Sequence, residues 1–411
     1  MAKVLIVISE FYPLQNATAN CVINLCRRFK QFNDSMQFDV LCFKTNSEDD
    51  LESYFDFFHI FRINKKSLID KQSFFSDSKN SVIDKLLFVV NKILFKIQKI
   101  VCSHPWRLGY KELLKGIRTL NKKNSYDYLL CVSGNYCSSY SGAIFKKESP
   151  IKLITYLTDP LIENPLYASK RKRNLLHDFD IIYSSSTMLA VTPIIYSNLK
   201  NKDKILPLEF PSFFEKETYT HDSKNIVFQK NKINLLYTGI FYPKIRTPDF
   251  LIKLLMNLPD DFVLHICGSV SKKFLSKYKE AIDKKRLMVY GNINHQLLFN
   301  AISDCDFLVN VGNNTSYMLP SKLISYISTG KPIINIVKIS NCPTLSYLFD
   351  YPNYVNIYEN NRMEDNLNLL LSFVFKPHQI IPKKDIYKMY ERCTTDYVAS
   401  QFYKNAFSKR N

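Results

Sequence analysis

The sequence predicts an α/β protein made of two domains in tandem, each built around a parallel β-sheet. At 411 residues, the chain is too long for one ordinary hydrophobic core. Hydrophobic residues make up 46% of it, which is enough to fill two cores. Short apolar runs alternate with longer stretches of helical period, the pattern of strand–helix–strand units. Two Rossmann-like domains are the simplest architecture that satisfies these observations.

The first domain is predicted to span residues 1–215. A helix is expected near Asn20–Phe32, after the first strand. The predicted strands of this domain are Lys3–Ser9, Phe38–Phe43, Tyr128–Val132, Lys152–Leu157, Ile181–Ser184 and Lys204–Leu208.

The second domain is predicted to span residues 216–385, after a polar linker at Pro211–Lys232. Its predicted strands are Asn234–Thr238, Phe262–Cys267, Leu287–Tyr290, Phe307–Val311 and Pro332–Ile336. Its predicted helices are Pro248–Leu258, Lys272–Asp283, His295–Ser303 and Ser321–Thr329. Residues 386–411 then have a helical pattern with several aromatic side chains.

Charge and cysteine content restrict the classes of partner and cofactor. The formal charge of +19 suits an anionic partner, which means nucleic acid, acidic lipid or a phosphorylated small molecule. Nucleic acid is not expected, because the sequence holds no zinc-finger spacing, RNA-binding aromatic motif or homeodomain pattern. The ten cysteines are scattered without a CxxC pair, so we expect no metal and a reducing compartment.

The sequence predicts a cytoplasmic protein, because it has no signal-peptide core and no apolar stretch of about 18 residues. The segment Ile83–Val101 forms a strongly amphipathic helical pattern whose lysines fall within one arc. Those lysines are Lys85, Lys92, Lys96 and Lys99. The helix either lies on an anionic membrane surface, at the inner face of the plasma membrane, or packs on the sheet with a solvated lysine face.

The first domain offers polar residues at predicted strand ends but no dinucleotide cradle. No glycine precedes Gly109, so a G-x-G-x-x-G turn is excluded and NAD or FAD is not expected. The first turn instead carries Asn16 and Thr18, which allow a substrate to approach the backbone. Asp159 follows a later strand and is the candidate general base, although an Asp-Pro sequence is also a common turn. Asn135 is a weaker candidate of the same kind.

The second domain has the features of a diphosphate site. Glycines follow several of its predicted strands, and ligands of open α/β sheets bind at that edge. Gly239 is followed by Lys244 and Arg246, which either hold phosphate oxygens or form a solvated basic loop. Farther on, Pro320 and Ser321 open a short predicted helix whose amino end favours an anion.

The segment GNNTSYMLPSKLISYISTGKPIINI resembles the donor-site motif of glycosyltransferase family 4 and of its bacterial surface-polysaccharide relatives. That motif reads P-S-K-hydrophobic-x-E-Y, a few residues, and then G-K-P. The segments YTGIFYPKIRTPDFL, FVLHICGS and RLMVYGNINHQLLFNAISDCDFLVNVG are similar to the same family. The likeness covers about Asn234–Ile336, is looser over Lys3–Pro211 and is absent between Asn46 and Lys123.

The resemblance implies a GT-B glycosyltransferase, with two Rossmann-like domains facing across a cleft and residues 386–411 packing back on the first domain. It places the diphosphate of a nucleotide-sugar donor against Gly239, Lys244 and Arg246. Ser321 and Lys322, after Pro320, are placed beside the diphosphate or the sugar.

The chain departs from the family at two acidic positions. The family has a glutamate five positions before the glycine, on the donor ribose, and often a second one eight residues earlier. This chain has Ser325 and Tyr317 there. A serine offers one hydrogen bond where a carboxylate accepts two charge-assisted ones. Asn313 and Asn314 are the nearest polar substitutes.

By this resemblance, the expected activity is transfer of a hexose-type sugar to a polyprenyl-diphosphate-linked or glycan acceptor in capsule or O-antigen synthesis. Two alternatives remain. The missing glutamates suit a degenerate GT-B scaffold without catalysis, and the fold also suits a sugar-nucleotide epimerase. The scaffold is expected to bind no nucleotide sugar, and the epimerase is expected to turn over its donor without an acceptor.

Overall fold

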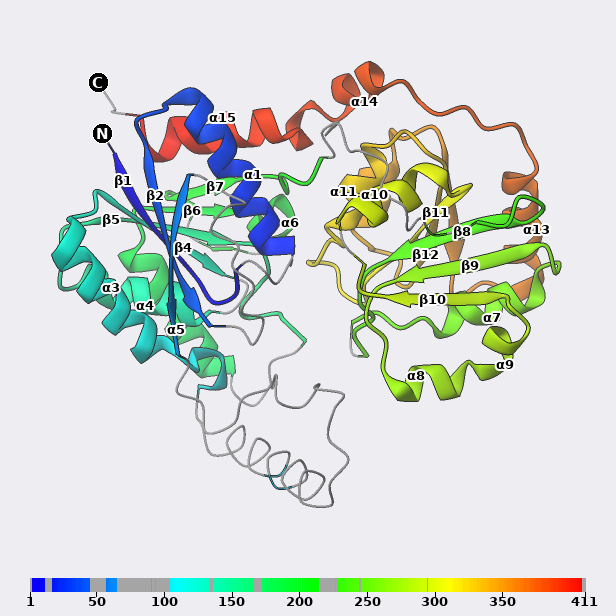
Figure 1. Cartoon of the computed structure of the whole chain (residues 1–411), viewed down its shortest axis with the longest axis horizontal. Coiled ribbons are helices and arrows are strands. Elements are labelled where there is room, and N and C mark those ends of the chain that lie inside the picture. The colour runs from blue at the N-terminus through cyan, green and yellow to red at the C-terminus, as the bar shows by residue number, and fades with distance from the viewer. Residues whose placement is uncertain are drawn as a thin grey trace. The chain divides into compact units, whose positions relative to one another are not determined.

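The computed structural model describes residues 2–11, 17–44, 57–64, 90, 93, 104–133, 136–165, 172–197, 199–200, 202–213, 226, 228–243, 245–293 and 295–408. The chain forms two compact units, the first made of Met1–Pro211 with Thr395–Asn411 and the second of Ser212–Thr394 (Figure 1). The first unit therefore ends at Pro211, whereas its predicted end was residue 215. The chain returns to the first unit at Thr395, whereas the predicted position was residue 386.

The first unit contains a seven-stranded parallel sheet with the order β3-β2-β1-β4-β5-β6-β7. Its strands are β1 Lys3–Ile8, β2 Gln37–Phe43, β3 Phe58–Ile63, β4 Tyr128–Ser133, β5 Lys152–Leu157, β6 Met188–Val191 and β7 Ile205–Pro207. The central strand β1 is buried at every position after Lys3, since helices cover both faces of the sheet.

Two layers of helices cover the first sheet (Figure 1). Helices α1 and α15 pack together on one face through aromatic contacts such as Phe29 with Phe402, whose ring centroids are 5.4 Å apart. The other face is covered by α3, α4 and α5. The helical elements of this unit are α1 Ala17–Phe32, η3 Pro105–Arg107, α3 Tyr110–Asn124, α4 Cys137–Lys146, α5 Lys172–Ser185, α6 Pro193–Tyr196 and α15 Thr395–Ala406.

The prediction of a strand at Ile181–Ser184 is wrong, because these residues lie in α5. The buried side chains of this helix are Leu175, Asp178 and Ile182, which recur at intervals of three and four residues and so share one helical face. The neighbouring strand is β6, which follows it. Tertiary packing along the whole helix therefore outweighs the local preference of a short β-branched run.

The second unit contains a six-stranded parallel sheet with the order β10-β9-β8-β11-β12-β13. Its strands are β8 Ile233–Thr238, β9 Phe262–Cys267, β10 Leu287–Gly291, β11 Phe307–Val311, β12 Ile333–Val337 and β13 Tyr354–Tyr358. Its helical elements are α7 Asp249–Asn257, α8 Lys272–Lys277, α9 Lys279–Asp283, α10 His295–Asp304, α11 Lys322–Ile327, α12 Thr344–Leu348, α13 Met363–Val374, α14 Lys383–Met389 and η5 Glu391–Cys393.

Two predicted helices of this unit differ from the observed ones. The predicted helix Lys272–Asp283 is split into α8 and α9 at Tyr278, whose φ of −112° is not helical. The Tyr278 hydroxyl donates to Asp249 at 2.5 Å, which anchors the break to α7. The predicted helix Ser321–Thr329 is the shorter α11, with only six residues.

Three asparagines, of which Asn310 and Asn335 are buried, fix the register of three neighbouring strands in the second sheet. Asn310, Asn335 and Asn356 are paired across β11, β12 and β13. The Asn310 amide donates to Asn335 Oδ1 at 2.7 Å, and the Asn335 amide donates to Asn356 Oδ1 at 2.8 Å. A slip of one residue would leave these amides without partners in the core, so the ladder specifies the pairing.

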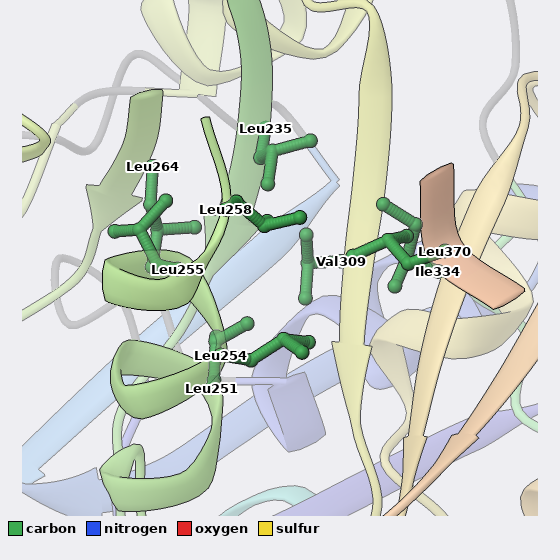
Figure 2. A pocket seen from close by; sticks show the side chains of 9 residues that line it. All are labelled: Leu235, Leu251, Leu254, Leu255, Leu258, Leu264, Val309, Ile334 and Leu370. Carbon is green, nitrogen blue, oxygen red and sulfur yellow. The ribbon is translucent and has the colours of Figure 1, made fainter. Parts of the chain in front are cut away.

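A small apolar cavity lies in the core of the second unit, between α7, α13 and the sheet (Figure 2). Leucine, valine and isoleucine side chains line it, among them Leu235, Leu254 and Val309. It has no hydrogen-bonding group that could orient a polar ligand, and apolar cavities of this kind stay dry. A polar ligand of this unit must therefore bind elsewhere.

Both sheets reverse the direction of their strand order at a single point, between β1 and β4 in the first and between β8 and β11 in the second. In open α/β sheets, ligands bind outside the carboxyl ends of the strands at this switch point. A ligand site of the second unit is therefore expected at the loops after β8 and β11.

Candidate functional site

The strand-end turns of the second sheet approach one another closely at glycines. A side chain at Gly268, which follows β9, would place its Cβ only 1.9 Å from the Gly239 carbonyl oxygen. Gly239, which follows β8, has a φ of +124°, a conformation that other residues rarely adopt. Glycine at these two positions therefore allows the two turns to pack against each other at the sheet edge.

Lys322 extends from the start of α11 to this same edge. Its amine donates to the Thr238 hydroxyl at 3.1 Å, and it lies so close to Gly239 that an added Cβ would be 3.0 Å from its Nζ. Tyr326, one turn along α11, holds Thr238 in place by bonding to both its backbone N–H and its hydroxyl at 2.9 Å. The lysine is thus directed onto the end of β8 by a buried framework.

The surroundings of Lys322 disfavour its charged form. Burial, and to a smaller extent the nearby Arg246 guanidinium, lower the pKa of its amine to about 7. Cys267 has the opposite effect on Lys322, but burial raises the pKa of that thiol to about 11. The thiol is therefore uncharged at neutral pH and does not neutralise the lysine.

Arg246 reaches the site from the loop after β8. Tyr242 and Arg246 close this loop by two backbone hydrogen bonds of 2.9 and 2.7 Å. The guanidinium donates to the Ile240 carbonyl at 3.4 Å, whereas its Nε is buried without a hydrogen-bond partner. An unpartnered buried guanidinium N–H is costly, so it marks a position where an acceptor is expected to bind. Lys244 lies outside the described residues.

The loop after β11 brings two further buried polar atoms that have no partner. Asn313 Oδ1 and Thr315 Oγ1 are both buried and unbonded, although the Asn313 amide donates to the Met318 carbonyl at 2.8 Å. The Asn314 N–H donates to the Ile245 carbonyl at 2.7 Å, which ties this loop to the loop of Arg246. With Arg246 Nε, the two loops at the switch point therefore carry three buried side-chain atoms without a hydrogen-bond partner.

The site carries positive charge without a compensating carboxylate. Two other buried or partly buried cations of this unit pair with carboxylates, Lys338 with Glu359 at 3.1 Å and Arg286 with Asp260 at 2.7 Å. The buried Lys331 amine instead donates to two backbone carbonyls at 2.8 Å. In the part of the chain that the structure describes, neither Lys322 nor Arg246 forms an ion pair with a carboxylate. Desolvated cations without a counter-charge favour an anionic ligand.

The remaining predicted donor residues do not all point to this site. Pro320 is buried before α11, and Ser321 precedes the helix without a side-chain capping bond. Ser325 Oγ donates to the Ser212 carbonyl at 2.8 Å, so its hydroxyl holds the start of the second unit. Because α11 has only six residues, its amino end does not by itself make an anion site. The positive charge of the site therefore comes from the side chains of Lys322 and Arg246.

In the first unit, Asp159 lies just past the end of β5, as the sequence predicts. Burial raises the pKa of its carboxyl from 3.8 to about 6. Tyr136 donates its hydroxyl to the Asp159 carbonyl, which fixes the turn. Thr18 is half-buried in the first turn of α1. Asn16 and Asn135 are outside the described ranges, as are Lys85, Lys92, Lys96 and Lys99.

Thr238, Tyr326 and Thr315 also belong to the site but were not predicted from the sequence, whereas Gly268 was among the glycines expected at this edge. Thr238 has the clearest signal, since it directly precedes Gly239 at a strand end. Tyr326 has none, because only the packing of α11 on β8 brings its hydroxyl to Thr238. Within the described residues, no cluster of His, Cys, Asp and Glu side chains could hold a metal ion.

Solved structures resemble this chain over nearly its whole length. WaaG, a glycosyltransferase involved in lipopolysaccharide biosynthesis, has 11% identity and a TM-score of 0.60, covering 99% of this chain and 100% of its own. HepE from Anabaena, in complex with UDP-glucose, has 9% identity and a TM-score of 0.59, with coverages of 99% and 96%. A UDP-N-acetylglucosamine 2-epimerase has 10% identity and a TM-score of 0.57, with coverages of 100% and 98%.

The chain has the GT-B fold. No family model matches the sequence, and neither does any curated protein sequence. Because only about one residue in ten is identical, the similarity to these structures establishes the fold. The function of the site depends on this chain's own side chains. In the described part of the chain, no helix is both long and apolar enough to cross a membrane.

Proposed function

We propose that the protein is a glycosyltransferase that moves a hexose-type sugar from a nucleotide-sugar donor to a lipid-linked or glycan acceptor in bacterial surface-polysaccharide synthesis. The observation that carries this proposal is the pair of Lys322 and Arg246. Both cations converge on a glycine-lined sheet edge, and no carboxylate among the described residues neutralises them. A diphosphate supplies the counter-charge and the acceptor atoms that such a site lacks.

The same residues suit the chemistry of sugar transfer. When the bond between the sugar and the diphosphate breaks, negative charge develops on the departing phosphate oxygens. Preorganised cations at that position stabilise the transition state more than the ground state. Arg246 can donate two parallel hydrogen bonds to phosphate oxygens, while Lys322 acts as a point charge.

Asp159 is the proposed acceptor-side base. With a pKa of about 6, its carboxyl is mostly ionised at neutral pH yet remains a stronger base than an ordinary aspartate. It can accept the proton of an acceptor hydroxyl as that oxygen attacks the sugar. No metal ion is required in this scheme, because the two cations perform the electrostatic role.

The net charge supports our proposal for the acceptor and for the place of action. A formal charge of +19 suits a polyprenyl-diphosphate acceptor and an anionic membrane surface, and we propose peripheral association with the inner face of the plasma membrane. Flotation with liposomes tests this. Wild type should float with anionic vesicles at low salt and remain behind with neutral ones, and equal behaviour with both would contradict the proposal.

The central test is calorimetry with a panel of UDP-, GDP-, ADP-, CMP- and dTDP-sugars, comparing wild type with Arg246→Ala. We expect one donor to bind wild type and the variant to bind it at least about 100-fold more weakly, because a buried charge-assisted contact to phosphate is lost. Lys284→Ala is the matched control, since Lys284 is exposed and pairs only with Glu280. Absence of binding to every donor would favour the scaffold alternative.

An epimerase is the second candidate, since the chain also resembles a UDP-N-acetylglucosamine 2-epimerase. The two activities differ in their need for an acceptor. A donor labelled in the sugar is incubated with enzyme alone and with a membrane extract that contains acceptor. We expect no epimerised donor in the first reaction and sugar transfer in the second. Acceptor-free conversion to an epimer would replace the proposed function.

A further inference from the structure

Lys322 occupies an unusual position for a lysine. Its amine is partly buried, makes one hydrogen bond to Thr238 Oγ1 at 3.1 Å, and lies beside Gly239, where an added Cβ would be 3.0 Å from it. An ammonium group has three hydrogens to donate, so this environment satisfies an ammonium poorly. An uncharged amine suits it better, because the Thr238 hydroxyl can donate to it as readily as accept from it.

At neutral pH, the titratable groups around this amine either repel its positive charge or are uncharged. Arg246 faces it from the loop after β8 and repels a second positive charge. Cys267 at the end of β9 and Tyr237 in β8 are the titratable groups nearby, and burial raises the pKa of each. Tyr326, from α11 itself, is likewise neutral because burial raises its pKa. None of these groups supplies a negative charge at neutral pH.

A bound anion reverses this balance. A phosphate group placed between Arg246 and Lys322 offers oxygens that accept the remaining hydrogens of an ammonium group. It also offsets the repulsion between the two cations. The protonated lysine is therefore favoured in the complex and disfavoured in the free protein.

We infer that the site binds its anionic ligand together with a proton, which is held by the Lys322 amine. This inference rests on the proposed function, because it assumes that the anion site is the diphosphate site. It adds that the affinity for a nucleoside diphosphate falls as the pH rises above neutrality. It also adds that release of the diphosphate product returns the proton to solvent.

The test is isothermal titration calorimetry at pH 8.0 in buffers with different ionisation enthalpies. The probe is whichever of UDP, GDP, ADP and dTDP binds the wild-type protein most tightly. At this pH the terminal phosphate is already ionised, since its pKa is about 6, so the ligand contributes no proton change. With an amine pKa of about 7 in the free protein, wild type should take up about 0.9 proton per ligand.

Three variants and one pH series make the test specific. Lys322→Arg keeps the charge at every pH, so it should bind the ligand with no proton uptake. Lys322→Met should bind at least about tenfold more weakly, also without uptake. Lys277→Met, which removes an exposed lysine paired with Asp249, should behave as wild type. The wild-type dissociation constant should rise about eightfold from pH 7.5 to 8.5, whereas that of Lys322→Arg should stay nearly constant.

The outcomes separate this inference from the proposed function. Tight binding to wild type without proton uptake, or with uptake that persists in Lys322→Arg, would overturn the inference and leave the donor site intact. Failure of wild type to bind every one of the four diphosphates would overturn both.

Discussion

The carboxyl edges of the two sheets carry different chemistry, although both sheets are fully parallel and share the strand order around their switch points. The edge of the first sheet presents Asp159, whose carboxyl has its pKa raised to about 6. The edge of the second presents Lys322, whose amine has its pKa lowered to about 7. Burial is the main cause of both shifts, because it disfavours the charged form of an acid and of a base alike.

This comparison teaches how one fold can prepare two roles. The ordinary pKa values of an aspartate and a lysine lie far apart. Desolvation brings both pKa values close to neutral pH, so each group can exchange a proton under physiological conditions. What differs is the backbone beside them. Gly239 and Gly268 let two turns of the second edge approach closely, whereas the turn that carries Asp159 contains prolines and is fixed by Tyr136.

The largest expected effect concerns the close contact between Gly268 and the Gly239 carbonyl at the edge of the second sheet. Gly268→Ala should destabilise the second unit by about 3 kcal/mol or more and abolish nucleotide binding, because the new Cβ collides with the Gly239 carbonyl. Chemical denaturation and calorimetry measure the two effects. Gly291→Ala is the control, since its Cβ would meet no atom within 4 Å and only its positive φ adds strain. Equal tolerance of both substitutions would show that the turns do not converge as described.

The next effect concerns the first edge. Asp159→Asn should lower the transfer rate by about 100-fold, because an amide cannot accept the acceptor proton. The pKa of Asp159 is raised in the folded state. Its contribution to the stability of the folded protein is therefore lost as the pH rises from about 4 through about 6. At pH 7.5 the variant should therefore be more stable than wild type, by about 1 kcal/mol.

Thermal unfolding at pH 5 and pH 7.5 checks that sign, with Asp180→Asn on the exposed face of α5 as the control. A stabilised but inactive variant identifies a catalytic carboxylate. A destabilised variant with normal transfer would mean that Asp159 serves only the turn before Pro160.

The smallest effect concerns Ser325, which stands where glycosyltransferase family 4 has a glutamate. Ser325→Ala should cost about 1 kcal/mol of stability through the lost bond to the Ser212 carbonyl. Its affinity for the nucleoside diphosphate should stay within twofold of wild type. Ser346→Ala, which removes a hydroxyl bonded to the Pro343 carbonyl in α12, is the matched control. A tenfold loss of affinity in Ser325→Ala alone would place this hydroxyl in the donor site.

Much of the fold could be predicted from local pattern. The strands Lys152–Leu157, Phe262–Cys267 and Phe307–Val311 have the predicted bounds, because each is a buried apolar run between polar turns. The strand predicted at Ile181–Ser184 failed because β-branched residues on a buried helix face look like a strand in isolation. The strand β3 was missed, since three of its side chains are aromatic or charged and most are only half-buried.

The candidate site could be predicted only in part. The glycine at the end of β8 and the basic loop after it adjoin one another in the sequence, so Gly239 and Arg246 were accessible to pattern reading. Lys322 was named from resemblance, but the lowering of its amine pKa depends on burial beside Thr238 and Gly239 and on the nearby Arg246. Lys322 and these residues come from separate parts of the chain, and only the folded sheet edge brings them together.

A crystal structure of the protein bound to its preferred nucleoside diphosphate tests the central claim most directly. The account predicts phosphate oxygens within hydrogen-bonding distance of both Lys322 Nζ and the Arg246 guanidinium, beside the Gly239 backbone. A ligand whose phosphates bind elsewhere, with Lys322 still bonded only to Thr238, would contradict it.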